Sequence, residues 1–246
     1  MADALEWPMA LWPKDATFHP DIPSKSGGLS TNGFEQVTVS PAGRWRARIS
    51  VSAISEETVL AWRALIASMM GRVGTILVPK WELFGPADRN GRRFNSNSAT
   101  PYDDHVSNWD LTGFGQAQEL VAVLANEVGR GSTQIVVSLN KIEGPRPGQY
   151  FGIGRRLHLV QSAYQEEEGG LTTLRFWPPL RVAAPAFTPV ILDKPVCLMR
   201  FAQDSTGELF LERGLHGEGT FELVEASPNS TEVNPAIPGG ALFLKS

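Results

Sequence analysis

The sequence has a single cysteine, Cys197, among its 246 residues. One cysteine excludes an internal disulfide and any zinc site built from several cysteines. No run of about 18 apolar residues is present, so we expect no membrane-spanning helix and no membrane anchor. The first residues, Met1–Glu6, have neither a basic region nor an apolar region, so we expect no secretory signal.

An excess of basic residues is also missing. The chain has 22 Lys and Arg against 26 Asp and Glu, and its net charge is −4. Because proteins bind nucleic acid largely through a basic surface that contacts phosphates, this balance disfavours specific nucleic-acid binding.

The composition is that of a folded protein rich in turns. Hydrophobic residues make up 42% of the chain and charged residues 20%, enough apolar side chains to form a core. Glycine (24) and proline (18) together form about 17% of the residues, against roughly 12% on average. This favours a mainly β fold over a helical bundle, and the length fits one large β domain or two small ones.

The clearest strand pattern lies in residues 34–53. After a turn at Pro41-Ala42-Gly43, apolar and polar residues alternate with a period of two. The apolar positions are Trp45, Ala47, Ile49, Val51 and Ala53, and the polar positions are Arg44, Arg46, Arg48, Ser50 and Ser52. The arginine row is either a solvated face or a surface that meets an acidic partner.

One helix is predicted, over about residues 55–70. Ser55 suits the N-cap and Gly71 the left-handed position after the helix. Its buried face is predicted to hold Val59, Trp62, Leu65, Ile66 and Met69. Residues 118–128 have a helix-like spacing too, but the run is short and stays ambiguous. Further strands are predicted at residues 74–79, 134–139, 150–153, 157–164, 171–177, 190–193, 196–201, 209–211 and 220–224.

Residues 81–117 have no convincing periodicity and are predicted to form a long loop. Such loops are usually functional or disordered. Arg89, Arg92 and Arg93 give this one a local positive charge, and we expect them to contact another subunit. Asp103-Asp104-His105 is the one local cluster with metal-ligand side chains, but no second ligand group follows at a recognisable spacing, so we predict a solvated loop and no metal site.

The two ends of the chain are predicted to be extended arms. Residues 1–33 contain several X-Pro pairs, which disfavour helix, yet carry Trp7 and Trp12. Residues 227–246 are rich in Pro, Asn, Ser and Gly, yet carry Leu242 and Phe243. These four apolar side chains are predicted interface residues. The N-terminal arm is predicted to pack on its own domain or on a neighbour, and an ordinary loop folded over the core is the open alternative.

No catalytic constellation is evident. Cys197 lies in a run that is typical of a core strand, which argues against a nucleophile paired with His216. Gly152 and Gly154 lack the third glycine and the following helix of a dinucleotide-binding motif. We therefore predict that the protein is not an enzyme and has no catalytic residues and no cofactor.

Three stretches of the sequence carry a resemblance to a known family. They are Trp62–Ile66 with Gly71–Pro79; Thr100–His105; and a set made of Pro147–Gly154, Leu157–Val160, Phe176–Arg181 and Pro195–Arg200. Together they resemble minor tail proteins of long-tailed bacteriophages, of the distal-tail and tail-tip hub type. The similarity covers roughly residues 34–202, and Trp177-Pro178-Pro179-Leu180-Arg181 is its most specific piece.

This resemblance implies a split-barrel or β-sandwich domain like that of tail tube subunits, with one helix. Residues 34–80 with 195–226 would form this tube-like domain, and residues 118–192 a second small β region inserted into it. The implied function is that of a structural virion protein of the tail tip, made in the host cytoplasm. It would form a homo-oligomeric ring, a hexamer by preference and a trimer as the alternative. Its partners would be the tail tube, tail hub and tape-measure proteins.

Two other functions stay open from the residues alone. The first is a receptor- or carbohydrate-binding β module at the tail tip, in which Trp81, Tyr102 or Trp109 stacks on sugar. The second is an enzyme that acts on cell wall or glycan through paired carboxylates.

Overall fold

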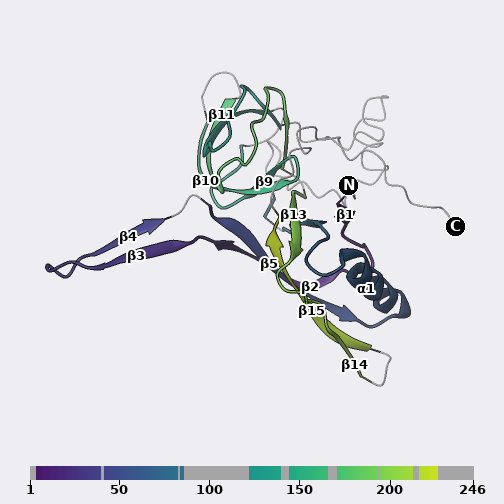
Figure 1. Cartoon of the computed structure of the whole chain (residues 1–246). Helices are drawn as coiled ribbons and strands as arrows, with labels where there is room; N and C mark the ends of the chain where they lie inside the picture. The colour runs from purple at the N-terminus through teal and green to yellow at the C-terminus, as the bar shows by residue number, and fades with distance from the viewer. Residues whose placement is uncertain are drawn as a thin grey trace, which may run out of the picture.

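The computed structural model describes residues 4–39, 42–82, 84–85, 122–139, 144–165, 171–192, 194–212 and 216–226. Over these residues the protein is mainly β, with one helix, α1 (Glu56–Met69), as the sequence predicts. The described strands form three units, a large open sheet, a closed barrel and a separate two-stranded hairpin (Figure 1).

The open sheet contains strands from both the N-terminal and the C-terminal parts of the described chain. Its strand order is β1-β6-β13-β15-β5-β2, and β14 also pairs with β15. The strands are β1 (Leu5–Glu6), β2 (Pro13–Asp21), β5 (Arg44–Ala53), β6 (Ile76–Pro79), β13 (Val196–Phe201), β14 (Leu209–Glu212) and β15 (His216–Glu225). All neighbours are antiparallel except β1 and β6, which are parallel.

The barrel is built from strands between β6 and β13 in the chain. Its order is β10-β11-β8-β7-β12-β9, closed by pairing between β9 and β10. The strands are β7 (Ala122–Leu124), β8 (Gln134–Leu139), β9 (Tyr150–Ile153), β10 (Arg156–Gln165), β11 (Leu171–Trp177) and β12 (Pro189–Ile191). Residues 122–124 are thus strand, because pairing on both sides prevails over the helix-like spacing of this segment.

The prediction of an extended arm over residues 1–33 is wrong for its described part. β1 and β2 belong to the sheet, and Leu11 between them is fully buried. β2 tolerates Pro13 and Pro20 because it is an edge strand, paired only with β5, so the missing N–H groups break no ladder on a second side. The predicted boundary at residue 33 also falls inside the hairpin formed by β3 (Ser24–Leu29) and β4 (Glu35–Val39).

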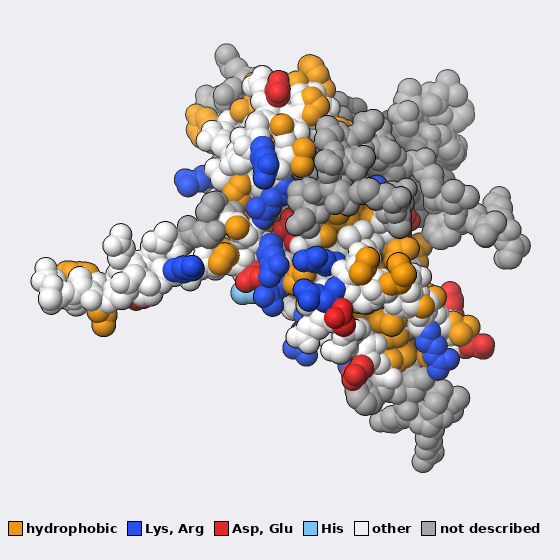
Figure 2. Space-filling view, viewed as in Figure 1, with side chains coloured by type: hydrophobic (Ala, Val, Ile, Leu, Met, Phe, Trp, Pro, Cys, Tyr) orange, Lys and Arg blue, Asp and Glu red, His pale blue; other side chains and the backbone are white. Residues whose placement is uncertain are grey.

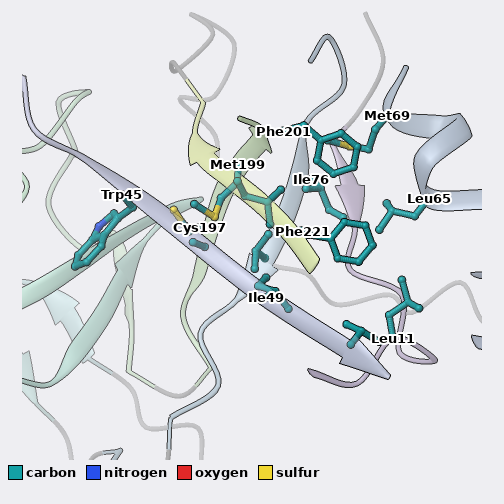
Figure 3. Close-up of a cluster of buried hydrophobic side chains, with 14 of the residues drawn as sticks. Leu11, Trp45, Ile49, Leu65, Met69, Ile76, Cys197, Met199, Phe201 and Phe221 are labelled. Atoms are coloured by element: carbon teal, nitrogen blue, oxygen red, sulfur yellow. The ribbon is translucent and has the colours of Figure 1, made fainter. Parts of the chain in front are cut away.

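Helix α1 packs one face on the sheet (Figure 3). Its N-cap is Ser55, whose Oγ accepts from the Thr58 N–H at 3.2 Å, and the Ser55 N–H donates to Thr58 Oγ1 at 3.2 Å. Trp62 stacks on Phe221 with ring centroids 3.9 Å apart. The left-handed C-cap is Met70 (φ 45°), one residue earlier than the predicted Gly71, which also has a positive φ. The predicted face is buried except for Ile66, which is half-buried.

The barrel and the sheet are joined by buried contacts. Leu157 of β10 is part of the sheet's core, and its carbonyl accepts a hydrogen bond from Trp45 Nε1 at 2.8 Å. Arg156 Nη1 lies 3.1 Å from Glu225 Oε1, and Glu225 Oε2 accepts from the Trp45 N–H at 3.1 Å. Because both charges are buried and paired, removing either one would leave the other uncompensated.

Candidate interaction surface

The hairpin β3–β4 continues the β2–β5 pair away from the rest of the molecule (Figure 1). Its turn is closed by the Ser30 N–H donating to the Phe34 carbonyl at 2.9 Å, and by the Phe34 N–H donating to Ser30 Oγ at 3.2 Å. Gly33 (φ 76°) lies in this turn, and Gly28 (φ 86°) lies in a bulge between Ser26 and Leu29. Glycine adopts these left-handed conformations without steric cost.

The register gives the hairpin two unlike faces. Leu29 lies opposite Glu35, and Ser26 lies opposite Val37. Opposed residues of an antiparallel pair share a face, as do residues two apart on one strand. Ser26, Leu29, Glu35 and Val37 are therefore on one face, which we call the apolar ribbon face after Leu29 and Val37. The other face carries Lys25, Gln36 and Thr38.

The apolar ribbon face is exposed to solvent. Leu29 is 77% exposed and Val37 54%, and Phe34 in the turn is 78% exposed. Figure 2 shows hydrophobic side chains at the tip of the projecting hairpin. A two-stranded ribbon is marginally stable by itself and normally needs a third strand or another element against its apolar face. Its composition and position therefore suit contact with a partner.

Sequence reasoning missed this hairpin, although a signal was present. Thr31-Asn32-Gly33 is a run of turn-forming residues, and it lies between Leu29 and the alternating segment that starts at Glu35. The Gly33 N–H donates to the Ser30 carbonyl at 2.9 Å, so Thr31 and Asn32 are the central residues of the turn and Gly33 takes the left-handed position after them. The X-Pro pairs earlier in the chain favoured an arm instead.

The predicted interface residues fall in different environments. Trp7 packs within its own chain, because its Nε1 donates to the Leu11 carbonyl at 2.8 Å and its ring contacts Trp81 and Phe221 edge-on. Trp12 is 66% exposed. Outside the described residues lie Arg89, Arg92, Arg93, Leu242 and Phe243, together with Tyr102, Asp103, Asp104, His105 and Trp109.

The arginine row of β5 is engaged with its own chain. Asp21 Oδ2 lies 2.9 Å from Arg46 Nε and 3.1 Å from Arg44 Nε. These hydrogen bonds, from Arg46 first and Arg44 second, hold the pKa of Asp21 below its usual range. The third arginine, Arg48, lies opposite Glu222 on one side and Thr17 on the other. Two arginines of the row, Arg44 and Arg46, therefore pair with one carboxylate of the neighbouring strand β2.

The reactive and charged side chains among the described residues have surroundings that suit a structural role. Cys197 is fully buried, and burial raises the pKa of its thiol, so it is no nucleophile. A polar hollow of about 390 Å³ is lined by Arg48, Glu218, Glu222 and the segment 203–208. The hydrogen bond from Lys14 lowers the pKa of Glu218, the opposite of what a general acid needs. Within the described residues, no three His, Cys, Asp or Glu side chains form a group that could hold a metal.

Comparison with known proteins gives no relative: no model of a protein family matches the chain, and no curated protein matches it. The one described helix, α1, is neither long nor apolar enough to cross a membrane.

Proposed function

We propose that this chain is a structural protein of a bacteriophage tail tip. In this proposal it forms a homo-oligomeric ring that joins the tail tube to the hub or baseplate, a hexamer by preference and a trimer as the alternative. The tail tube, hub and tape-measure proteins are its proposed neighbours. The resemblance of residues 34–202 to minor tail proteins suggests this function, and the exposed apolar ribbon face is the observation that supports it.

The hairpin leaves its apolar side chains unpacked. The sheet and the barrel each enclose a cluster of buried side chains, whereas the hairpin leaves Leu29, Phe34 and Val37 in solvent. Burial of such side chains in an interface stabilises an assembly, since each contributes about 1.5–3 kcal/mol when fully removed from water. In a ring, the contribution is repeated at every subunit.

The test is the mass and shape of the purified full chain. We expect native mass spectrometry to find a hexamer or a trimer, and negative-stain electron microscopy to show closed rings. The double substitution Leu29→Ser with Val37→Ser should reduce ring formation. Tyr164→Ser is the matched control, because Tyr164 is 69% exposed on barrel strand β10. A monomer at every concentration would contradict the proposal, and binding of that monomer to glycans would favour the carbohydrate-binding module instead.

A further inference from the structure

We infer that the apolar ribbon face of one subunit packs on the outward face of helix α1 in a second copy of this chain. This inference rests on the proposed function, because it identifies the surface that receives the hairpin within the ring. It follows from two unpartnered faces that the same chain carries at distant places.

The outward face of α1 carries a short apolar stripe between charged residues. Leu60 is 53% exposed, and Ala64 and Ala67 are exposed as well. Their spacing of four and three residues aligns them in one stripe, opposite the buried side of Trp62 and Met69. We call Leu60, Ala64 and Ala67 the helix stripe. Figure 2 shows hydrophobic side chains over the position that α1 occupies in Figure 1.

The two faces match in size and relief. α1 has 14 residues and is therefore about 21 Å long. The hairpin strands have six and five residues, which span about 17–20 Å. Two alanines in the helix stripe leave a shallow surface on which a flat ribbon can lie close to the helix backbone, while Leu29 and Val37 pack beside Leu60.

The charges beside the two faces are opposite. Glu35 lies on the apolar ribbon face, and Arg63 flanks the helix stripe, three residues after Leu60 and four before Ala67. Lys25, the basic residue of the hairpin, lies on the other face. Glu56 and Glu57 in the first turn of α1 would repel Glu35, so the ribbon should be oriented with Glu35 towards Arg63.

The hairpin of a subunit cannot pack on the helix stripe of the same subunit. The hairpin and α1 lie at opposite sides of the molecule in Figure 1. A contact between two different surfaces of identical chains is head-to-tail, and it closes into a ring when the rotation between subunits divides a full turn. The inferred contact thus has the symmetry that the proposed function requires.

The first experiment is site-specific cross-linking of the full chain. Val37→Cys combined with Ala64→Cys should give covalent oligomers with a short bismaleimide, up to the full ring. Cys197 is fully buried and should not react. The matched control is Thr38→Cys with Ala64→Cys, since Thr38 lies on the opposite face of the same strand. We expect at least a fivefold lower yield there, and equal yields would overturn the inference.

The second experiment exchanges the two charges. Glu35→Arg and Arg63→Glu should each weaken assembly by about fivefold per contact, as expected for loss of an exposed ion pair. The double exchange should restore assembly. Lys25→Glu, on the other ribbon face, is the control and should assemble like the unmodified chain. A double exchange that assembles no better than the single ones would overturn the inference.

The results separate this inference from the proposed function. One outcome is that Leu29→Ser with Val37→Ser prevents assembly while Val37→Cys with Ala64→Cys forms no cross-link. The ring is then supported, but the helix stripe is not the surface that receives the hairpin. If the unmodified chain is a monomer at every concentration, both fail. Circular dichroism of each variant shows that it is folded, which is expected because all substituted side chains are exposed.

Discussion

The closed barrel and the hairpin are both antiparallel β structure, but the barrel buries its apolar side chains and the hairpin exposes them. The barrel leaves no free strand edge, and Phe151 and Phe176 are buried inside it. Among the described residues, the hairpin pairs with no third strand, and it exposes Leu29 and Val37. Strands that are paired on both sides form all their ladder hydrogen bonds within one chain. An isolated amphipathic ribbon needs a third strand or another element against its apolar face. The comparison predicts that substitutions in the packed part change folding and that substitutions in the hairpin change assembly.

The largest effect is expected from Trp62→Ala in the packed part. Trp62 is 1% exposed, stacks on Phe221, and donates from Nε1 to the Gly207 carbonyl at 2.8 Å. The substitution removes these contacts and leaves a cavity between α1 and the sheet. We expect the free energy of unfolding to fall by about 3–5 kcal/mol, measured by urea denaturation. A loss below about 1 kcal/mol would mean that α1 adds little to the sheet.

The second effect is a pH dependence that arises inside the barrel. His158 is fully buried between Phe151 and Phe176, and its Nδ1 donates to the Pro178 carbonyl at 2.8 Å. Burial first, and the charges of Arg156 and Arg181 as well, lower the pKa of His158 from 6.5 to about 4.

The sign follows from the two states. Below pH 6.5 the unfolded chain takes up a proton at this histidine, while the folded chain stays neutral down to about pH 4. Stability is therefore full above pH 6.5 and falls as the pH drops towards 4, by about 3 kcal/mol in total. Urea unfolding between pH 4 and 7 measures this slope, and His158→Phe should flatten it whatever its own stability. An unchanged slope in that variant would assign the pH dependence to other groups.

The comparison also separates what the sequence could and could not predict. β11 was predicted with its observed bounds, Leu171–Trp177, because a short apolar run between glycine and proline is typical of a strand. Barrel closure was not predictable, since pairing of β7 with β12 joins segments far apart in the chain. Pro13 and Pro20 concealed β2, because a proline looks the same in a loop and on a sheet edge.

The candidate surface shows the same division. The alternation in residues 35–39 and the turn-forming residues Thr31, Asn32 and Gly33 are local and could have revealed the hairpin. Its exposure could not have been predicted, because that depends on the direction in which the chain leaves β2 for β3 and returns from β4 to β5. Trp7 illustrates a different limit: an apolar residue in a proline-rich segment suggests packing on its own domain or on a neighbour, and the structure has its ring against Phe221 of its own chain.

The smallest effect on stability is expected from the hairpin itself. In the isolated subunit, Leu29→Ser with Val37→Ser removes apolar atoms that already contact water, so no cavity forms and little burial is lost. We expect the free energy of unfolding of the monomer to change by no more than about 0.5 kcal/mol, as for other surface substitutions. The measurement is urea denaturation at a concentration where the unmodified chain is dissociated. The same variant should nevertheless assemble poorly, since its exposed leucine and valine are the groups that the ring would bury. A monomer destabilised by 2 kcal/mol or more would show that the ribbon packs against its own chain, and the difference between barrel and hairpin would then be one of degree.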